Sequence, residues 1–128
     1  MKKVLALAAV AEAGTGVILL AYPPIVVRLL FGAEISGAGV AMSRLAGIAL
    51  IGLGAACWPG NSIFQPLIGM LTYSTLAMLY LIIVGLSGGG TGPLLWAGVC
   101  VHALLIALLA ATWVKRRKSL ATEGQLMD

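Results

Sequence analysis

The stretch GVAMSRLAGIALIGLGAACW, residues 39–58, decides how this chain folds. It is apolar and rich in small residues along its whole length, and about 20 helical residues span the ~30 Å hydrocarbon core of a bilayer. The stretch also contains Arg44. A cation inside such a segment costs several kcal/mol unless it has a partner or reaches the interface. The partner of Arg44 therefore determines how the other apolar segments are arranged.

The composition of the whole chain is that of a membrane protein. Of its 128 residues, 61% are hydrophobic and 9% are charged, whereas about a quarter of the residues in a soluble domain are charged. No segment alternates apolar and polar residues as the strands of a membrane barrel do, and helices satisfy their backbone hydrogen bonds internally. The sequence therefore predicts a single all-α domain, residues 1–128, that forms an integral membrane four-helix bundle.

Four apolar segments are long enough to span a bilayer, and turn-forming residues separate them. Pro23 and Pro24 end the first segment, Pro59-Gly60-Asn61 ends the second, and a glycine-rich connector at 87–92 ends the third. The expected spans cover residues 4–22, 39–58, 64–86 and 93–114, and they are followed by a polar, loosely ordered tail at 115–128.

The segment IVVRLLFGAEISG, residues 25–37, is too short to span. Its apolar residues flank Arg28, and two interpretations stay open. The segment is either a short amphipathic helix in the membrane interface or a plain external loop.

The basic residues mark the two ends of the chain. Lys2 and Lys3 precede the first span and residues 115–118 follow the last one, whereas Arg28 is the basic residue of the opposite connections. Because Lys and Arg favour the cytoplasmic side of short loops, this pattern predicts cytoplasmic termini in a multi-pass protein of the bacterial inner membrane. The same residues suit lipid headgroups, so we expect membrane lipid and no nucleic acid as a partner.

The beginning of the chain also imitates a secretory signal peptide. Two lysines precede a short apolar run, and Ala11-Glu12-Ala13 imitates the small-residue cleavage site. The apolar run continues to Ala21, however, and we expect this segment to be retained as the first span.

The chain contains two cysteines, Cys57 and Cys100, and one histidine, His102. This set is too small for a conventional zinc site within one chain, so no metal and no cofactor are expected. Cys57 lies near the inner end of its span and Cys100 lies in the outer half of another. We therefore expect both to remain free thiols within the chain.

Five polar side chains are expected to meet inside the membrane. A rise of about 1.5 Å per residue places Glu12 roughly 15 Å, His102 roughly 13 Å and Arg44 roughly 8 Å below the outer ends of their spans. Tyr73 and Tyr80 are seven residues apart and are expected to share one face of the third span. The predicted polar core or ligand site therefore consists of Glu12, Arg44, Tyr73, Tyr80 and His102.

Within this set, Glu12 and Arg44 are predicted to pair, and two interpretations of the pair stay open. The pair belongs to a proton-linked or ligand-binding site, or it fixes how the first two spans dock. Small residues near each charge, such as Gly16 and Gly47, favour close helix packing in lipid. The chain has no serine–histidine–acid set and no phosphate-binding glycine motif, which favours a non-enzymatic function.

Three runs of sequence carry a resemblance to other proteins. RLAGIALIGLGAACWPG (44–60), MLTYSTLAMLYL (70–81) and GPLLWAGVCVHALL (92–105) resemble a group of small uncharacterised bacterial four-span proteins, similar in layout to the DoxX-like membrane proteins. The likeness extends from Gly16 to about Leu109. It implies the four-span fold and brings no assigned chemistry.

The chain is also similar to the small multidrug resistance family in length, in the number of spans and in a glutamate in the first span. This second match stops at Glu12. A working carboxylate in that family trades protons for cationic drugs, and an arginine beside it would compete with the cargo.

The sequence therefore predicts a small accessory or lipophilic-ligand-binding membrane protein. Its expected partners are membrane lipid, a lipophilic small molecule, and a second copy of the chain or a larger membrane complex. Two alternatives remain, a proton-coupled exporter of the small multidrug type that uses Glu12 and a subunit of a quinone-linked membrane oxidoreductase.

Overall fold

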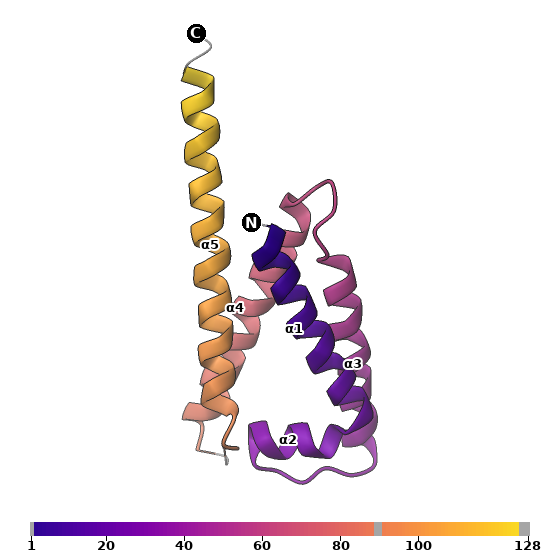
Figure 1. Ribbon diagram of the computed structural model, residues 1–128. Helices are drawn as coiled ribbons and strands as arrows, with labels where there is room; N and C mark the ends of the chain where they lie inside the picture. Colours follow the sequence, from indigo (N-terminus) through magenta and orange to yellow (C-terminus); the bar gives the residue numbers. More distant parts are fainter. Residues whose placement is uncertain (1, 89–90, 126–128) are drawn as a thin grey trace.

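The computed structural model describes residues 2–88 and 91–125, with the side chains of residue 116 and residues 119–125 left aside. Across these ranges the chain is helical and has no strand. Its helices, in chain order, are α1 (Lys2–Ala21), α2 (Pro23–Phe31), α3 (Ala38–Ala56), α4 (Phe64–Leu86) and α5 (Leu95–Gln125) (Figure 1).

The all-α membrane fold is confirmed. Four helical segments are long and apolar enough to cross a bilayer: Lys2–Ala21, Ala38–Ala56, Phe64–Leu86 and Leu95–Lys115. Their ends differ by no more than two residues from the spans expected from the sequence. The agreement follows from local signals, since prolines and glycines end each apolar run.

The four long helices form two pairs instead of one uniform bundle. Helix α1 packs along α3, and α4 packs along α5, whereas contacts between the pairs are sparse. The pairs meet at the end of the molecule where both termini lie, and they diverge toward the opposite end, which α2 crosses (Figure 1). We call these ends the terminal end and the α2 end.

The α1–α3 pair is held by direct contact between the two backbones. A Cβ added to Gly16 would lie 2.6 Å from the carbonyl oxygen of Gly47, and one added to Gly54 would lie 2.6 Å from that of Ala9. Side chains larger than hydrogen would therefore force the helices apart. Small residues at these positions let helices associate in lipid through close packing.

An apolar core fills the terminal end, where the two pairs meet. Its members come from α1, α4, α5 and the residue that follows α3, and they pack against one another with almost no exposed surface. They are Leu5, Ala8, Ala9, Cys57, Leu67, Met70, Leu105 and Leu109.

Helix α2 connects the two pairs at the α2 end. It ends at Gly32, whose φ of 66° is left-handed and whose N–H donates to the carbonyl of Arg28. The carbonyls of Leu29 and Leu30 accept hydrogen bonds from the N–H groups of Leu94 (2.9 Å) and Gly92 (3.0 Å). Of the two interpretations of residues 25–37, the short helix is therefore correct up to Phe31, and the remainder is a connection to α3.

The expectation of a loosely ordered tail is wrong for residues 115–125, because α5 continues to Gln125. Residues of high helix propensity dominate this stretch, and they extend an existing helix and therefore need no new nucleus. The guanidinium of Arg117 lies 5.2 Å from the ring centroid of Trp113, which also stacks at 5.3 Å against Phe64. Residues 126–128, and residues 89 and 90 of the predicted connector, lie outside the described part of the chain.

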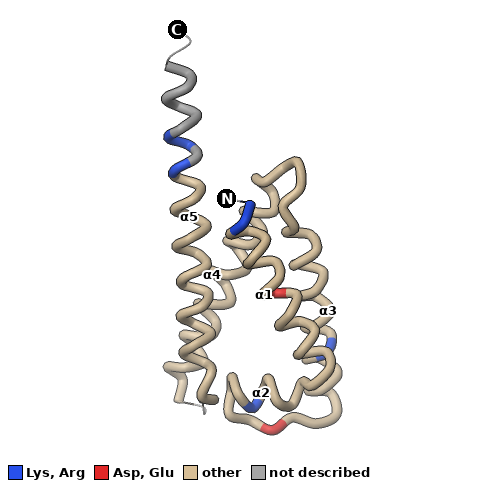
Figure 2. Tube along the Cα trace, in the orientation of Figure 1, with Lys and Arg blue, Asp and Glu red and all other residues tan. Residues whose placement is uncertain are grey.

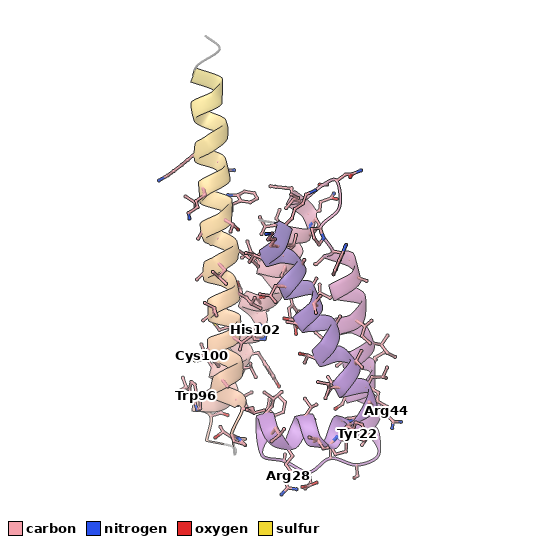
Figure 3. All side chains as sticks on the ribbon, in the orientation of Figure 1. Tyr22, Arg28, Arg44, Trp96, Cys100 and His102 are labelled. Atoms are coloured by element: carbon pink, nitrogen blue, oxygen red, sulfur yellow. The ribbon has the colours of Figure 1, made fainter. Side chains whose placement is uncertain are left out.

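Most of the basic residues that the structure describes lie at the terminal end of the helices, whereas Arg28 and Arg44 lie toward the α2 end (Figure 2 and Figure 3). Figure 2 shows Lys and Arg where α1 begins and where α5 leaves the other helices. Both cysteines are free thiols: Cys57 is buried at the end of α3, and Cys100 is exposed on α5. The expected placement of the two cysteines on different helices at different levels is thus found.

Candidate functional site

Glu12 is the acidic residue inside the contact between the helix pairs. It lies on the buried stripe of α1, which also includes Leu5, Ala8, Ala9 and Gly16. These residues recur every three or four positions, so they share one helix face. Only 5% of Glu12 is exposed. The carboxyl group is therefore held next to the apolar core by the packing of α1.

His102 of α5 is the ionisable group that meets Glu12. Its Nδ1 lies 4.0 Å from Oε1 of Glu12, a separation beyond the range of a direct hydrogen bond. His102 precedes the core residue Leu105 by three positions on α5, which brings both to the face that packs on α1 and α4. Its Nδ1 is buried and has no hydrogen-bond partner.

Helix α4 adds two hydroxyl groups to this site. The ring of Tyr73 meets the ring of His102 edge to face, with centroids 5.9 Å apart, which places its phenol group in the same layer. Ser74 is fully buried, and its Oγ has no hydrogen-bond partner. We call Glu12, Tyr73, Ser74 and His102 the polar cluster.

Ser74 was not among the residues predicted from the sequence. It follows Met70 by four positions and Leu67 by seven, so it continues the buried stripe of α4. A serine on an otherwise apolar stripe was the signal that could have identified it.

The polar cluster forms the layer next to the apolar core on its α2 side. Each member is three or four residues from a core residue of its own helix and lies on the α2 side of that residue. Glu12 follows Ala9 on α1 and Ser74 follows Met70 on α4, whereas His102 precedes Leu105 on α5 because α5 runs the other way. Three helices from both pairs therefore contribute to one polar layer, and this layer closes the contact between the pairs.

The predicted pair of Glu12 and Arg44 is not formed. Arg44 is exposed on α3, and no ion pair or hydrogen bond joins it to any residue that the structure describes. Helices α1 and α3 run antiparallel, and the contact of Gly16 with Gly47 sets their register. Arg44 therefore lies level with the end of α1 (Figure 3), about three turns below Glu12.

Tyr80 also lies outside the cluster, with 61% of its surface exposed. Tyr73 and Tyr80 start from similar positions around α4, but α1 meets α4 only near the terminal end. The face that is covered at Tyr73 is therefore uncovered at Tyr80. Of the five predicted site residues, the structure brings together Glu12, Tyr73 and His102.

The chemistry available to the cluster is hydrogen bonding and the sharing of a proton. A carboxylate in a medium of low dielectric needs a counter-charge, and His102 is the nearby group that can supply one. Within the described ranges, no group of three or more His, Cys, Asp or Glu side chains could hold a metal ion.

Comparison with models of protein families, with curated proteins and with solved structures finds nothing that matches this chain. The resemblance to the DoxX-like proteins therefore stays a prediction.

Proposed function

We propose that this chain is a non-enzymatic protein of the bacterial inner membrane that binds the polar group of a lipophilic small molecule at the polar cluster. The observation that carries this proposal is the pair of buried polar atoms without partners, Oγ of Ser74 and Nδ1 of His102. They belong to the two helices of one pair, α4 and α5, and they lie in a layer that also contains the buried carboxyl group of Glu12 on α1.

The energetic argument concerns what satisfies these atoms. A buried polar atom without a hydrogen bond costs about 1–3 kcal/mol. Glu12 and His102 are 4.0 Å apart, so a third group that bonds to both would replace a contact that is too long. A hydroxyl or carbonyl group of a ligand supplies such bonds.

Apolar surface for the remainder of such a molecule lies beside the cluster. Val99 and Ile106 lie one turn on either side of His102 on the same face of α5, and both are half-buried. A hydrocarbon or ring system can lie against them while its polar group enters the layer. This arrangement is typical of membrane sites for amphiphilic ligands, in which few polar groups fix the orientation.

The site can be tested with two tyrosines that differ in position but not in chemistry. We expect organic extracts of protein purified from bacterial membranes to contain an enriched lipophilic molecule by mass spectrometry. Tyr73→Phe and Ser74→Ala should reduce its amount about tenfold, as expected for the loss of one buried hydrogen bond. Tyr80→Phe removes the same hydroxyl from an exposed ring and should retain the molecule. Equal retention by all three variants would contradict the proposed site.

A proton-coupled exporter is the second candidate, and the position of Arg44 favours it. Glu12 has no arginine beside it, so a cationic substrate would not compete with a fixed cation for the carboxylate. For an exporter we expect Glu12→Gln to abolish drug resistance in cells while the melting temperature stays close to that of the wild type. Cells that keep their resistance with Glu12→Gln would exclude this candidate.

The proposed orientation places both termini in the cytoplasm. It is supported by the basic residues at the terminal end of α1 and α5. Alkaline phosphatase fused after Val114 should be inactive, whereas fusions within residues 87–92 should be active, because the enzyme folds only outside the cytoplasm. The opposite pattern of activity would reverse the orientation.

A further inference from the structure

Arg44 is a charged side chain on a surface that is otherwise apolar. Its exposed neighbours on α3 are Met42 (64%), Leu45 (58%) and Ile48 (55%). In a helix long and apolar enough to span a bilayer, such a surface faces lipid hydrocarbon. The guanidinium therefore needs an anion or a path to the interface.

The geometry of α3 directs this side chain toward the interface. Arg44 is six residues from Ala38, where α3 begins at the α2 end, so its Cα lies roughly 9 Å along the helix. Side chains of a helix tilt toward its N-terminus, which in α3 is the α2 end. A long arginine side chain can cover much of the remaining distance while its stem stays against apolar surface.

Tyr22, which follows the last residue of α1, lies at the same height along the helices as Arg44. A Cβ on Gly47 would lie 2.9 Å from the backbone nitrogen of Leu20, so Arg44, one turn earlier on α3, is level with Tyr22 at the end of α1. Figure 3 shows both residues at the same corner of the molecule. Tyr22 is 65% exposed, and exposed tyrosines are enriched at the headgroup level of membranes.

We propose that Arg44 binds the phosphate group of a phospholipid in the leaflet at the α2 end. A guanidinium group presents paired N–H donors that match two phosphate oxygens. The acids that the structure describes in this chain are engaged elsewhere, since Glu12 faces His102 and Glu34 pairs with Arg28 at 3.7 Å. A lipid phosphate is the anion that every copy of the protein meets at this depth.

Arg28 provides a matched control at the same end of the molecule. It is also an exposed arginine, with 74% of its side chain accessible, but it already has a carboxylate partner in Glu34. Loss of the Arg28 charge should therefore leave the binding of lipid at Arg44 nearly unchanged.

The test measures lipid binding to the full chain in detergent, by native mass spectrometry during titration with dioleoylphosphatidylglycerol. Dioleoylglycerol has the same tails without the phosphate and should bind more weakly. We expect Arg44→Gln to weaken binding of the phospholipid about fivefold or more, as for one cation at a membrane surface. Arg44→Lys keeps the charge but loses the planar guanidinium, so its affinity for the phospholipid should lie between those of the wild type and Arg44→Gln. Arg28→Gln should bind the phospholipid as the wild type does.

Three results would overturn the proposal. One is equal phospholipid binding by the wild type and Arg44→Gln, and another is equal binding of dioleoylglycerol and phosphatidylglycerol by the wild type. The third is a wild-type dimer that becomes a monomer with Arg44→Gln at constant lipid, measured by light scattering, because Arg44 would then meet an acid of a second copy. All of these outcomes leave the polar cluster untouched.

Discussion

Gly54→Ala is expected to lower the free energy of unfolding by about 1–3 kcal/mol, the usual cost of forcing an extra carbon into a packed contact. The new Cβ would lie 2.6 Å from the carbonyl oxygen of Ala9 and 2.9 Å from Cβ of Ala13. Neither neighbour is a flexible side-chain end, so α1 and α3 must separate. Unfolding by sodium dodecyl sulfate in mixed micelles, followed by circular dichroism, measures the loss.

Gly52→Ala is the matched control on the same helix. A Cβ at Gly52 meets nothing within 4 Å, and alanine is a better helix former than glycine by up to about 1 kcal/mol. This variant should be as stable as the wild type or more stable. If both variants lost the same free energy, backbone contact could not be what holds α1 against α3.

The second large effect concerns the coupling of Glu12 and His102. We expect Glu12→Gln and His102→Gln each to lower the free energy of unfolding, because each leaves the other group without its polar partner. The double variant should lose less than the two single losses together, with an interaction energy of about 0.5–2 kcal/mol. The same unfolding measurement on the four proteins gives this value.

A second cycle with Arg44 provides the control. Arg44 lies about three turns of α1 away from Glu12, so Glu12→Gln and Arg44→Gln should be additive. Coupling of Glu12 to Arg44, combined with additivity for His102, would restore the pairing expected from the sequence alone and would contradict the arrangement of α1 and α3.

The spans could be predicted from the sequence because their signals are local. The third expected span, 64–86, has the bounds of α4 itself, since a proline-containing turn precedes it and a glycine-rich connector follows. The level of Glu12 and His102 could also be predicted, because a depth follows from a count of residues. Neither estimate depends on how the helices are arranged around one another.

The positions of Arg44 and Tyr80 could not be predicted in the same way. A count of residues gives the depth of a side chain but not the helix that covers it, and the divergence of the two pairs leaves the face of Tyr80 uncovered. The sequence does contain a signal for the register of α1 against α3. Ala9 and Gly16 are seven residues apart, as are Gly47 and Gly54, and the antiparallel match of these spacings places Arg44 beyond the reach of Glu12.

Helix α2 acts as a spacer of fixed length between the two pairs. At one end it continues from α1, and at the other its last carbonyls hold the backbone N–H groups of Gly92 and Leu94. Backbone bonds do not depend on which side chains are present, so the number of residues in α2 sets the separation. Nine helical residues measure roughly 14 Å at 1.5 Å per residue. A change in the separation of the pairs at this end must therefore either bend the junction of α1 and α2 at Tyr22 or break these bonds.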